Sequence, residues 1–268
     1  MEGGRGATEI RLAAIADLHI RFRGPLPLAD AISQLRTAVE VLVVAGDITD
    51  GGRLPEAERA ADLLASAGVP VVAVLGNHDL RTLRRRAFRR VFERRGITLL
   101  DGGATIIRTA GGREIGFAGV GGCGGGFWPD EGPDALHSRA SRALALRAHR
   151  EATRLDVALA ETAECDVRVA ITHFAPTSST LGREPVAKYW MLGNCELGRV
   201  IDHAAVDLAI HGHAHLGSAE GRTAGGTPVR NVALSVTGGL AIYAISLPRP
   251  SSHSWQAAAA LLAMGGIA

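Results

Sequence analysis

Residues 41–47 have the sequence VLVVAGD: five apolar residues in a row, followed by a glycine and an aspartate. A short, continuous apolar run that ends at a glycine is typical of a strand buried on both faces. Similar runs occur at residues 10–16 and 71–75, and helical patterns lie between them at 28–39 and 55–67. This alternation of strands and helices predicts an α/β fold with a parallel sheet.

The rest of the chain continues this pattern without a linker, an internal repeat or a low-complexity tract. The expected elements are a helix at 81–95, strands at 98–120 joined as hairpins at paired glycines, a helix at 136–164, strands at 167–172 and 206–210, and strands at 227–247 around a Gly238-Gly239 turn. One domain over residues 1–268 is therefore the simplest organisation, with residues 1–8 and 250–268 as peripheral segments.

Composition narrows the protein class but not the function. The 268 residues are 47% hydrophobic, which is enough for a sizeable core, and 29 basic and 27 acidic residues give a net charge of +2. Such a balanced charge points neither to nucleic acid nor to a membrane surface. Three cysteines without Cys-x-x-Cys spacing indicate a reduced, cytoplasmic setting. The absence of a signal-peptide core and of a long apolar run leads us to expect no membrane segment.

Polar side chains that bind metals follow five of the expected strands. Each of the following lies at or just after the C-terminal end of an apolar run: Asp17, Asp47, Asn77, His173 and His213. In parallel α/β sheets this edge is where ligands bind. We therefore expect five separate segments to converge on one site.

The residues around these positions form short motifs of ligand type. The motifs are Asp17-x-His19, Gly46-Asp47-x-x-Asp50, Gly76-Asn77-His78-Asp79, Thr172-His173 and His211-Gly212-His213-x-His215. Carboxylates, imidazoles and amide oxygens suit Mn, Fe, Co, Ni or Zn rather than a metal that prefers thiolates. Each motif alone is weak, but five together predict a metal site.

The five motifs occur, in this order, between residues 17 and 215, and the series resembles the calcineurin-like metallophosphoesterase superfamily. The match covers about three quarters of the chain. The resemblance implies a four-layer α/β/β/α sandwich with two mixed β-sheets and an active site at the C-terminal strand ends. It also implies two divalent metal ions as cofactors.

The resemblance further implies a role for each motif residue. Asp17, His19 and His215 would hold one ion. Asn77, His173 and His213 would hold the other, and Asp47 would bridge both. His78 would assist departure of the leaving oxygen, and Asp50 would orient it by accepting its other ring proton. A hydroxide bridging the two ions would attack phosphorus in line.

The substrate is less constrained than the reaction. Asp50 is followed by Gly51-Gly52 instead of the Arg-Gly of protein phosphatases, and the compact chain resembles small bacterial phosphodiesterases. We expect a phosphate-ester small molecule or nucleotide, with a diester favoured over a monoester. The arginine-rich segment 81–95 leaves a DNA or RNA nuclease as the alternative. A non-catalytic metal-bound binding module is disfavoured because His78 and every ligand position are present.

Three further residues are candidates for substrate contact. Phe127 and Trp128 lie in a glycine-rich stretch at 119–133, which we expect to form a mobile loop beside the site. They would stack on a base or leaving group, or else pack under the loop. His211 would contact the substrate region or form local hydrogen bonds. Asp79 is expected to brace its loop rather than take part in chemistry.

Overall fold

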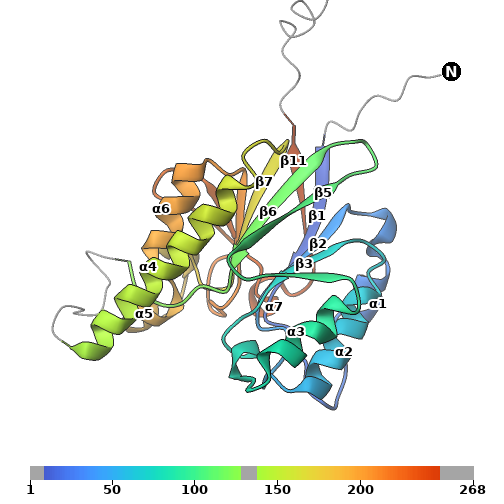
Figure 1. The fold of residues 1–268 in the computed structure, drawn as a ribbon, viewed down its shortest axis with the longest axis horizontal. Helices are drawn as coiled ribbons and strands as arrows, with labels where there is room; N and C mark the ends of the chain where they lie inside the picture. Colours follow the sequence, from blue (N-terminus) through green and yellow to red (C-terminus); the bar gives the residue numbers. More distant parts are fainter. Residues whose placement is uncertain (1–8, 128–137, 248–268) are drawn as a thin grey trace, which may run out of the picture.

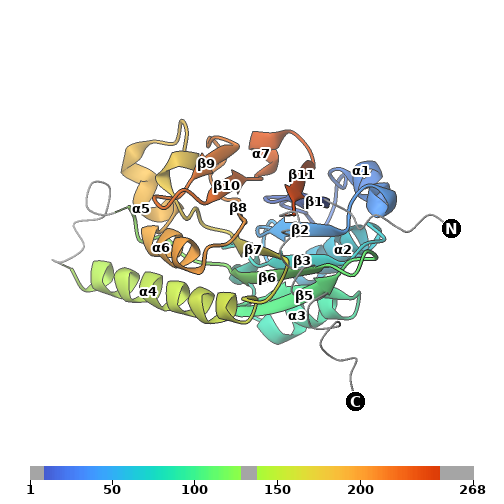
Figure 2. The ribbon, with the colours of Figure 1, turned by 90° about the horizontal axis from the view of Figure 1, so that it is seen from above.

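The computed structural model describes residues 9–127 and 138–247. The described strands form two sheets, which lie face to face between two layers of helices (Figures 1 and 2). The predicted four-layer α/β/β/α sandwich is therefore confirmed.

The first sheet has five strands, of which four are parallel. Their order is β11 (Ala241–Ser246), β1 (Glu9–Ile15), β2 (Val41–Ala45), β3 (Val71–Val74) and β4 (Ile97–Leu100). β2 lies at the centre, where Val43 pairs with Ala14 of β1 and Val72 of β3. All five residues of β2 are buried, as the continuous apolar run predicts for a central strand.

The second sheet has six strands and is also mixed. Their order is β5 (Gly103–Arg108), β6 (Glu114–Val120), β7 (Val167–Thr172), β8 (Leu208–His211), β10 (Pro228–Asn231) and β9 (Glu220–Arg222). The strands from β6 to β10 are parallel, and both edge strands are antiparallel to their neighbours.

Helices cover the outer face of each sheet (Figure 2). Those beside the first sheet are α1 (Ala29–Ser33), the 3-10 turn Leu35–Thr37, α2 (Leu54–Ala65) and α3 (Arg85–Glu93). Those beside the second are α4 (Arg139–Ala160) and α6 (Cys195–Ala204), while the short α5 (Tyr189–Leu192) packs in a separate cluster with Phe127 and Ala175. The remaining short elements are α7 (Leu234–Thr237) and 3-10 turns at Asp79–Arg81, Ser178–Thr180 and Val186–Lys188. None of the described helices is long and apolar enough to span a membrane.

The alternating sides of β1 show how the layers are packed. Ala13 and Ile15 join a buried cluster with α2 and α3, whereas Leu12 and Ala14 join a second cluster between the two sheets. A third cluster fills the space between the second sheet and the helices α4 and α6. Three apolar layers thus fix both sheets, and the parallel strands of both sheets contribute their C-terminal ends to the site.

Several expected elements differ from the observed ones. Gly102-Gly103 does not form a hairpin, because β4 belongs to the first sheet and β5 to the second; the predicted hairpin at Gly111-Gly112 does join β5 and β6. The strands on either side of Gly238-Gly239 likewise belong to different sheets. Both departures arise because the local pattern predicts a strand but not the sheet it joins.

The expected helices are also shorter than predicted. The stretch 28–39 contains one helical turn and a 3-10 turn, and α3 begins only at Arg85 rather than Arg81. The glycine-rich stretch begins later than expected, because β6 continues to Val120. Its described part, 121–127, is anchored by hydrogen bonds from the Gly125 and Gly126 amides to Trp190 and Gly193 carbonyls.

Candidate metal centre

The five motifs meet at the C-terminal edges of the two sheets. Asp17 and Asp47 follow β1 and β2, Asn77 follows β3, and His173 and His213 follow β7 and β8. The first three come from adjacent strands of one sheet and the last two from adjacent strands of the other. The convergence expected from the sequence is therefore present, and it is built by both sheets together.

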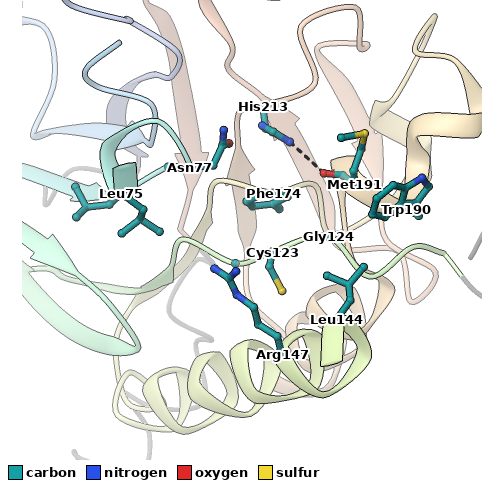
Figure 3. A pocket seen from close by; sticks show the side chains of 13 residues that line it. Leu75, Asn77, Cys123, Gly124, Leu144, Arg147, Phe174, Trp190, Met191 and His213 are labelled. Carbon is teal, nitrogen blue, oxygen red and sulfur yellow. Dashed lines mark hydrogen bonds between the residues drawn. The ribbon is translucent and has the colours of Figure 1, made fainter. Parts of the chain in front are cut away.

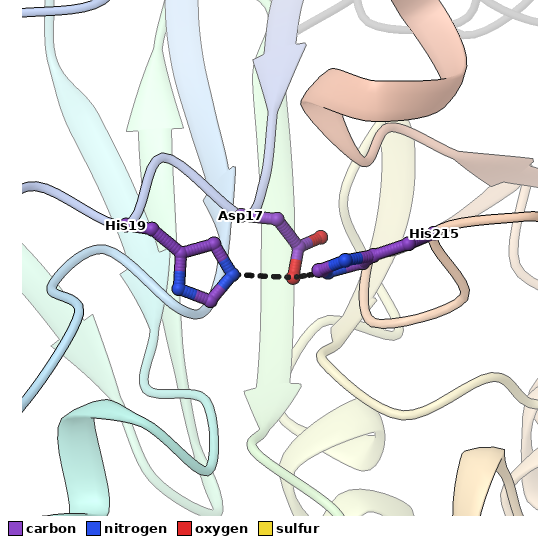
Figure 4. A group of neighbouring side chains, drawn as sticks. All are labelled: Asp17, His19 and His215. Atoms are coloured by element: carbon purple, nitrogen blue, oxygen red, sulfur yellow. Dashed lines mark hydrogen bonds and ion pairs between the residues drawn. The ribbon is translucent and has the colours of Figure 1, made fainter.

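One group consists of Asp17, His19 and His215 (Figure 4). The candidate ligand atoms of these three side chains all lie within 4.8 Å of one another. His215 Nε2 is 3.0 Å from Asp17 Oδ1, and His19 Nε2 is 3.9 Å from the same oxygen. The carboxylate thus lies between two imidazoles. One cation placed among the three side chains could bind all of them directly.

A second group consists of Asp47, His173 and His213, again within 4.8 Å. His173 Nε2 is 3.4 Å from Asp47 Oδ1 and 3.0 Å from the side-chain oxygen of Asn77. The other Asp47 oxygen, Oδ2, is 3.8 Å from His19 Nε2. Asp47 therefore faces both groups, one with each oxygen.

The backbone at this site is unusually strained. Positive φ angles occur at Asp17 (59°), His19 (43°), Asp47 (47°) and His213 (68°). Only two other non-glycine residues in the described ranges adopt this conformation. A left-handed conformation costs an L-residue roughly 1–2 kcal/mol. Strain concentrated at four neighbouring polar side chains is typical of a functional site.

Two glycines let the strand ends approach the carboxylates. A methyl group on Gly76 would overlap Asp47 Oδ1, and one on Gly212 would lie 2.5 Å from Asp17 Oδ2. Any other residue at either position would displace a carboxylate from the centre. The glycines of the motifs are therefore needed for close packing of the backbone around the side chains.

Three of the side chains at the site, Asp47, Asp17 and His213, have protonation states that favour cation binding. Burial raises the pKa of the Asp47 carboxyl, but the charge of His173 and its hydrogen bond outweigh burial and hold that pKa well below the usual range. The pKa of Asp17 is lowered as well, because a hydrogen bond from His215 and nearby histidine charge overcome its burial. Burial and the charge of His173 lower the pKa of His213 to about 3. Two charged carboxylates and a neutral imidazole are the forms that bind metals.

His19 provides the clearest sign that a group belongs here. Both of its ring nitrogens are buried, and neither has a hydrogen-bond partner among the described residues. Buried polar atoms in folded proteins nearly always have a partner, so an orphaned pair requires an explanation. A divalent ion bound to Nε2, which faces Asp17 and Asp47, would supply it. The donor set, with its nitrogen and oxygen atoms, fits such an ion.

His78 lies beside the two groups, with its Nε2 atom 3.9 Å from Asp47 Oδ2. Its Nδ1 atom donates a hydrogen bond of 2.7 Å to the backbone carbonyl of Asp50, and its Nε2 atom accepts one of 3.0 Å from Arg81 Nη2. The Asp50 carboxylate, by contrast, faces His19 Nδ1 at 3.7 Å and Arg21 at 3.2 Å. The oxygen of Asp50 that accepts the His78 ring proton is therefore its main-chain carbonyl, while its carboxylate faces other side chains.

Arg81 is the site residue that the sequence did not single out, because it lies within a run of arginines. It donates to the same Asp50 carbonyl at 3.2 Å as well as approaching His78. Its position three residues after His78, in the 3-10 turn Asp79–Arg81, is the signal that would have separated it from the others.

The three candidate substrate residues have different surroundings. His211 is fully buried; Nδ1 donates to the Gly212 carbonyl, and Nε2 accepts from Thr180. Burial lowers the pKa of its imidazole to about 4, so it is a neutral, locally bonded side chain. Phe127 is 9% exposed and packs edge to face against Tyr189 under the loop. Trp128 lies outside the described residues.

Asp79 braces two of the motif loops, as expected. It is fully buried and accepts hydrogen bonds from the amides of Ile48, Thr49 and Gly76, at 2.8–3.1 Å, and from the Thr49 hydroxyl at 2.7 Å. Burial, reinforced by the charge of Asp47, raises the pKa of its carboxyl to about 6. Asp79 thus ties the loop after β2 to the loop after β3.

The Asp79→Ala variant should lower the free energy of unfolding by about 3–5 kcal/mol, because three buried amides lose their acceptor. Urea denaturation measures this change. The exposed Asp156 of α4 supplies the matched control, and Asp156→Ala should change stability by less than about 0.5 kcal/mol. Equal stabilities of the two variants would contradict the bracing role.

A cavity of about 290 Å³ opens beside the second group (Figure 3). Asn77 and His213 lie on its wall next to the metal-binding side chains. The rest of the wall is mostly apolar and comes from the loops after β3 and β7, from α4 and from α5. These apolar lining residues are Leu75, Leu80, Leu144, Phe174, Trp190 and Met191. The cavity offers room for an organic group attached to a phosphate bound at the strand ends.

A two-sheet sandwich with a carboxylate-histidine centre at its strand ends defines a class of metal-dependent phosphoester hydrolases, and comparison with known proteins agrees. The model of the calcineurin-like phosphoesterase family matches residues 10–217. The chain belongs to this family. No curated protein sequence shows a significant match.

Solved structures share the fold at low identity. One chain matches with a TM-score of 0.57 and 16% identity, covering 90% of this chain and all of its own length. TT1561 of Thermus thermophilus matches with a TM-score of 0.54 and 14% identity, covering 89% of this chain and 99% of its own. A "Putative 5'-Nucleotidase from Staphylococcus aureus in complex with alpha-ketoglutarate" matches with a TM-score of 0.55 and 15% identity, covering 89% of this chain and 51% of its own.

Proposed function

We propose that this protein binds two divalent ions and hydrolyses a phosphate ester of a small molecule or nucleotide. The observation that carries the proposal is the position of Asp47, whose two oxygens face two separate ligand groups. Asp17, His19 and His215 would hold one ion, and Asn77, His173 and His213 the other. Divalent ions at these positions would bind phosphoryl oxygens and acidify a water molecule.

The chain's own residues account for positioning and proton movement. Asp50 holds His78 through its carbonyl, so that Nε2 points toward the space beside Asp47. In its protonated form His78 would donate from Nε2 to the departing ester oxygen. In the structure Arg81 Nη2 donates to Nε2 of the neutral ring at 3.0 Å; once His78 is protonated, the guanidinium would donate instead to the oxygen on which negative charge develops.

The cavity supports an ester with an apolar organic part. Inorganic phosphate alone would leave about 290 Å³ of mainly apolar space empty. A phosphodiester, or a monoester with a bulky alcohol, would fill it and remove that surface from water. The cavity therefore favours an ester with an organic part, and we keep the diester expected from the sequence ahead of the monoester.

The arginine-rich segment gives less support to a nuclease than its sequence implied. Arg94 and Arg95 pair with Glu58, and Arg95 also pairs with Asp62, at distances of 2.6–3.2 Å. Arg89 donates to the Leu99 carbonyl. Part of the positive charge of the segment 81–95 is therefore neutralised by carboxylates of α2, and Arg89 is held by a backbone carbonyl of β4, so these arginines are not free to bind a nucleic acid.

Metal binding should release at least one proton per chain at pH 7. Burial lowers the pKa of the His173 imidazole, but the charge of Asp47 outweighs burial and raises it to about 9. His173 thus holds a proton at pH 7 that must leave before its nitrogen can bind an ion. We expect affinity to rise with pH and to level off above a pH of about 9. Calorimetric titration in two buffers of different ionisation enthalpy counts the protons, and binding without proton release would contradict this.

The proposed function is tested by a matrix of metals and substrates. The metal-free protein would be loaded with Mn, Fe, Zn, Co or Ni and assayed on a monoester, a diester, cyclic nucleotides and single-stranded nucleic acid. We expect hydrolysis of at least one small ester that is lost with a chelator and restored by the metal. No hydrolysis with any pairing would favour a binding module, and preferential cleavage of nucleic acid would favour a nuclease.

A further inference from the structure

Arg147 lies on the wall of the cavity beside the second ligand group. The other described residues of this wall include no arginine, lysine, aspartate or glutamate. It extends from α4 toward the loop that carries Cys123 (Figure 3). Burial raises the pKa of the Cys123 thiol to about 11, so this neighbour is uncharged at neutral pH. Among its described lining residues, this mostly apolar cavity thus has one permanent positive charge besides the polar side chains of Asn77 and His213.

Nearby acidic groups in the described part of the chain are engaged elsewhere. Arg154, two turns further along α4, pairs with Asp101 at 2.6 Å and with Glu151 at 3.0 Å. Glu196 pairs with His149 at 2.8 Å. No ion pair joins any described carboxylate to Arg147, so its guanidinium has donors available for a ligand.

A second cavity, of about 130 Å³, adjoins the first on the side away from the ligand groups. Both cavities share Leu75, Leu80, Gly122 and Arg147 on their walls. The second also contains Arg85, together with the mutually paired Arg154, Asp101 and Glu151. Two charged side chains around the junction form no ion pair with a described residue. They are Arg85 and Arg147, and both are positive.

We propose that the organic part of the ester carries a second anionic group, a phosphate or a carboxylate, which binds Arg147 at the junction of the two cavities. This inference rests on the proposed function, since it assumes that the first phosphoryl group occupies the metal centre. The apolar wall would contact the body of the molecule between its two anions. Arginine suits this role because its planar fork bonds both oxygens of such a group.

Two arylphosphonates that differ only in charge test the inference without requiring catalysis. They are para-carboxyphenylphosphonate and para-carbamoylphenylphosphonate, and their binding to manganese-loaded protein would be measured by calorimetry. The carboxylate ligand should bind roughly threefold to tenfold more tightly, a range limited by the partial exposure of Arg147 to water.

The Arg147→Gln variant should bring the ratio of the two affinities to about one, and Arg147→Lys should leave an intermediate value. Arg150→Gln removes the same charge from the same helix, outside both cavities, and should keep the wild-type ratio. Equal affinities in the wild type, a ratio unchanged in Arg147→Gln, or loss of the ratio in Arg150→Gln would overturn the inference. If neither phosphonate binds, the metal centre does not accept a phosphoryl group, and the proposed function fails instead.

Discussion

The Asp47→Asn variant should lose metal binding and ester hydrolysis together, with kcat/KM lower by at least about a thousandfold. An amide has one oxygen, whereas the Asp47 carboxylate presents one oxygen to His173 and the other to His19. The substitution also removes a negative charge from between the two ligand groups. Metal analysis after gel filtration and a steady-state assay measure the two losses.

The exposed Asp62 of α2 provides a matched control, because Asp62→Asn makes the same chemical change far from the strand ends. It should keep its metals and its activity. If Asp47→Asn retained two ions per chain and nearly full turnover, Asp47 would not link the two groups.

The His78→Ala variant should keep its metals but lose turnover by about a hundredfold to ten-thousandfold. None of the proposed ligand positions is changed by this substitution, and the side chain that we propose as the proton donor is removed. The loss should be smaller for esters with strongly acidic leaving groups, which depart without a proton. Steady-state assays over a series of aryl esters, alongside metal analysis, measure both effects.

His203→Ala, on the exposed side of α6, is the control and should behave as the wild type. A His78→Ala enzyme with full activity on every ester would remove His78 from the mechanism. A variant that loses its metals would place His78 among the ligands, next to His19 and Asp50, with which it forms a third group of ligand-type side chains.

The sequence predicts the first half of the fold well because its signals are local and strong. The apolar runs before Asp17, Asp47 and Asn77 are interrupted only by Arg11, and each ends one or two residues before the side chain that enters the site. Since parallel strands place their C-terminal ends at one edge, the convergence follows from this pattern alone. The resemblance supplied the second sheet, which the periodicity of the chain could not show.

The remaining differences depend on tertiary contacts. The pairing of β11 with β1 joins residues 9–14 to 241–246, and no local pattern records that choice of sheet. Asp50 similarly fits its motif, but only the folded loop shows that its carbonyl reaches His78 while its carboxylate faces His19. The sequence likewise does not show that the nearby carboxylates of Asp101 and Glu151 pair with Arg154. Only the folded structure shows this pairing, which leaves the Arg147 guanidinium without an ion pair to a described carboxylate.

We propose that seven side chains at the strand ends hold two ions and that hydrolysis requires both ions. The most direct measurement is a titration of the metal-free protein with Mn²⁺, following bound metal and ester hydrolysis in the same samples. We predict that activity rises until two ions are bound per chain and then stops rising. Full activity at one ion per chain, or hydrolysis by the metal-free protein, would contradict the account.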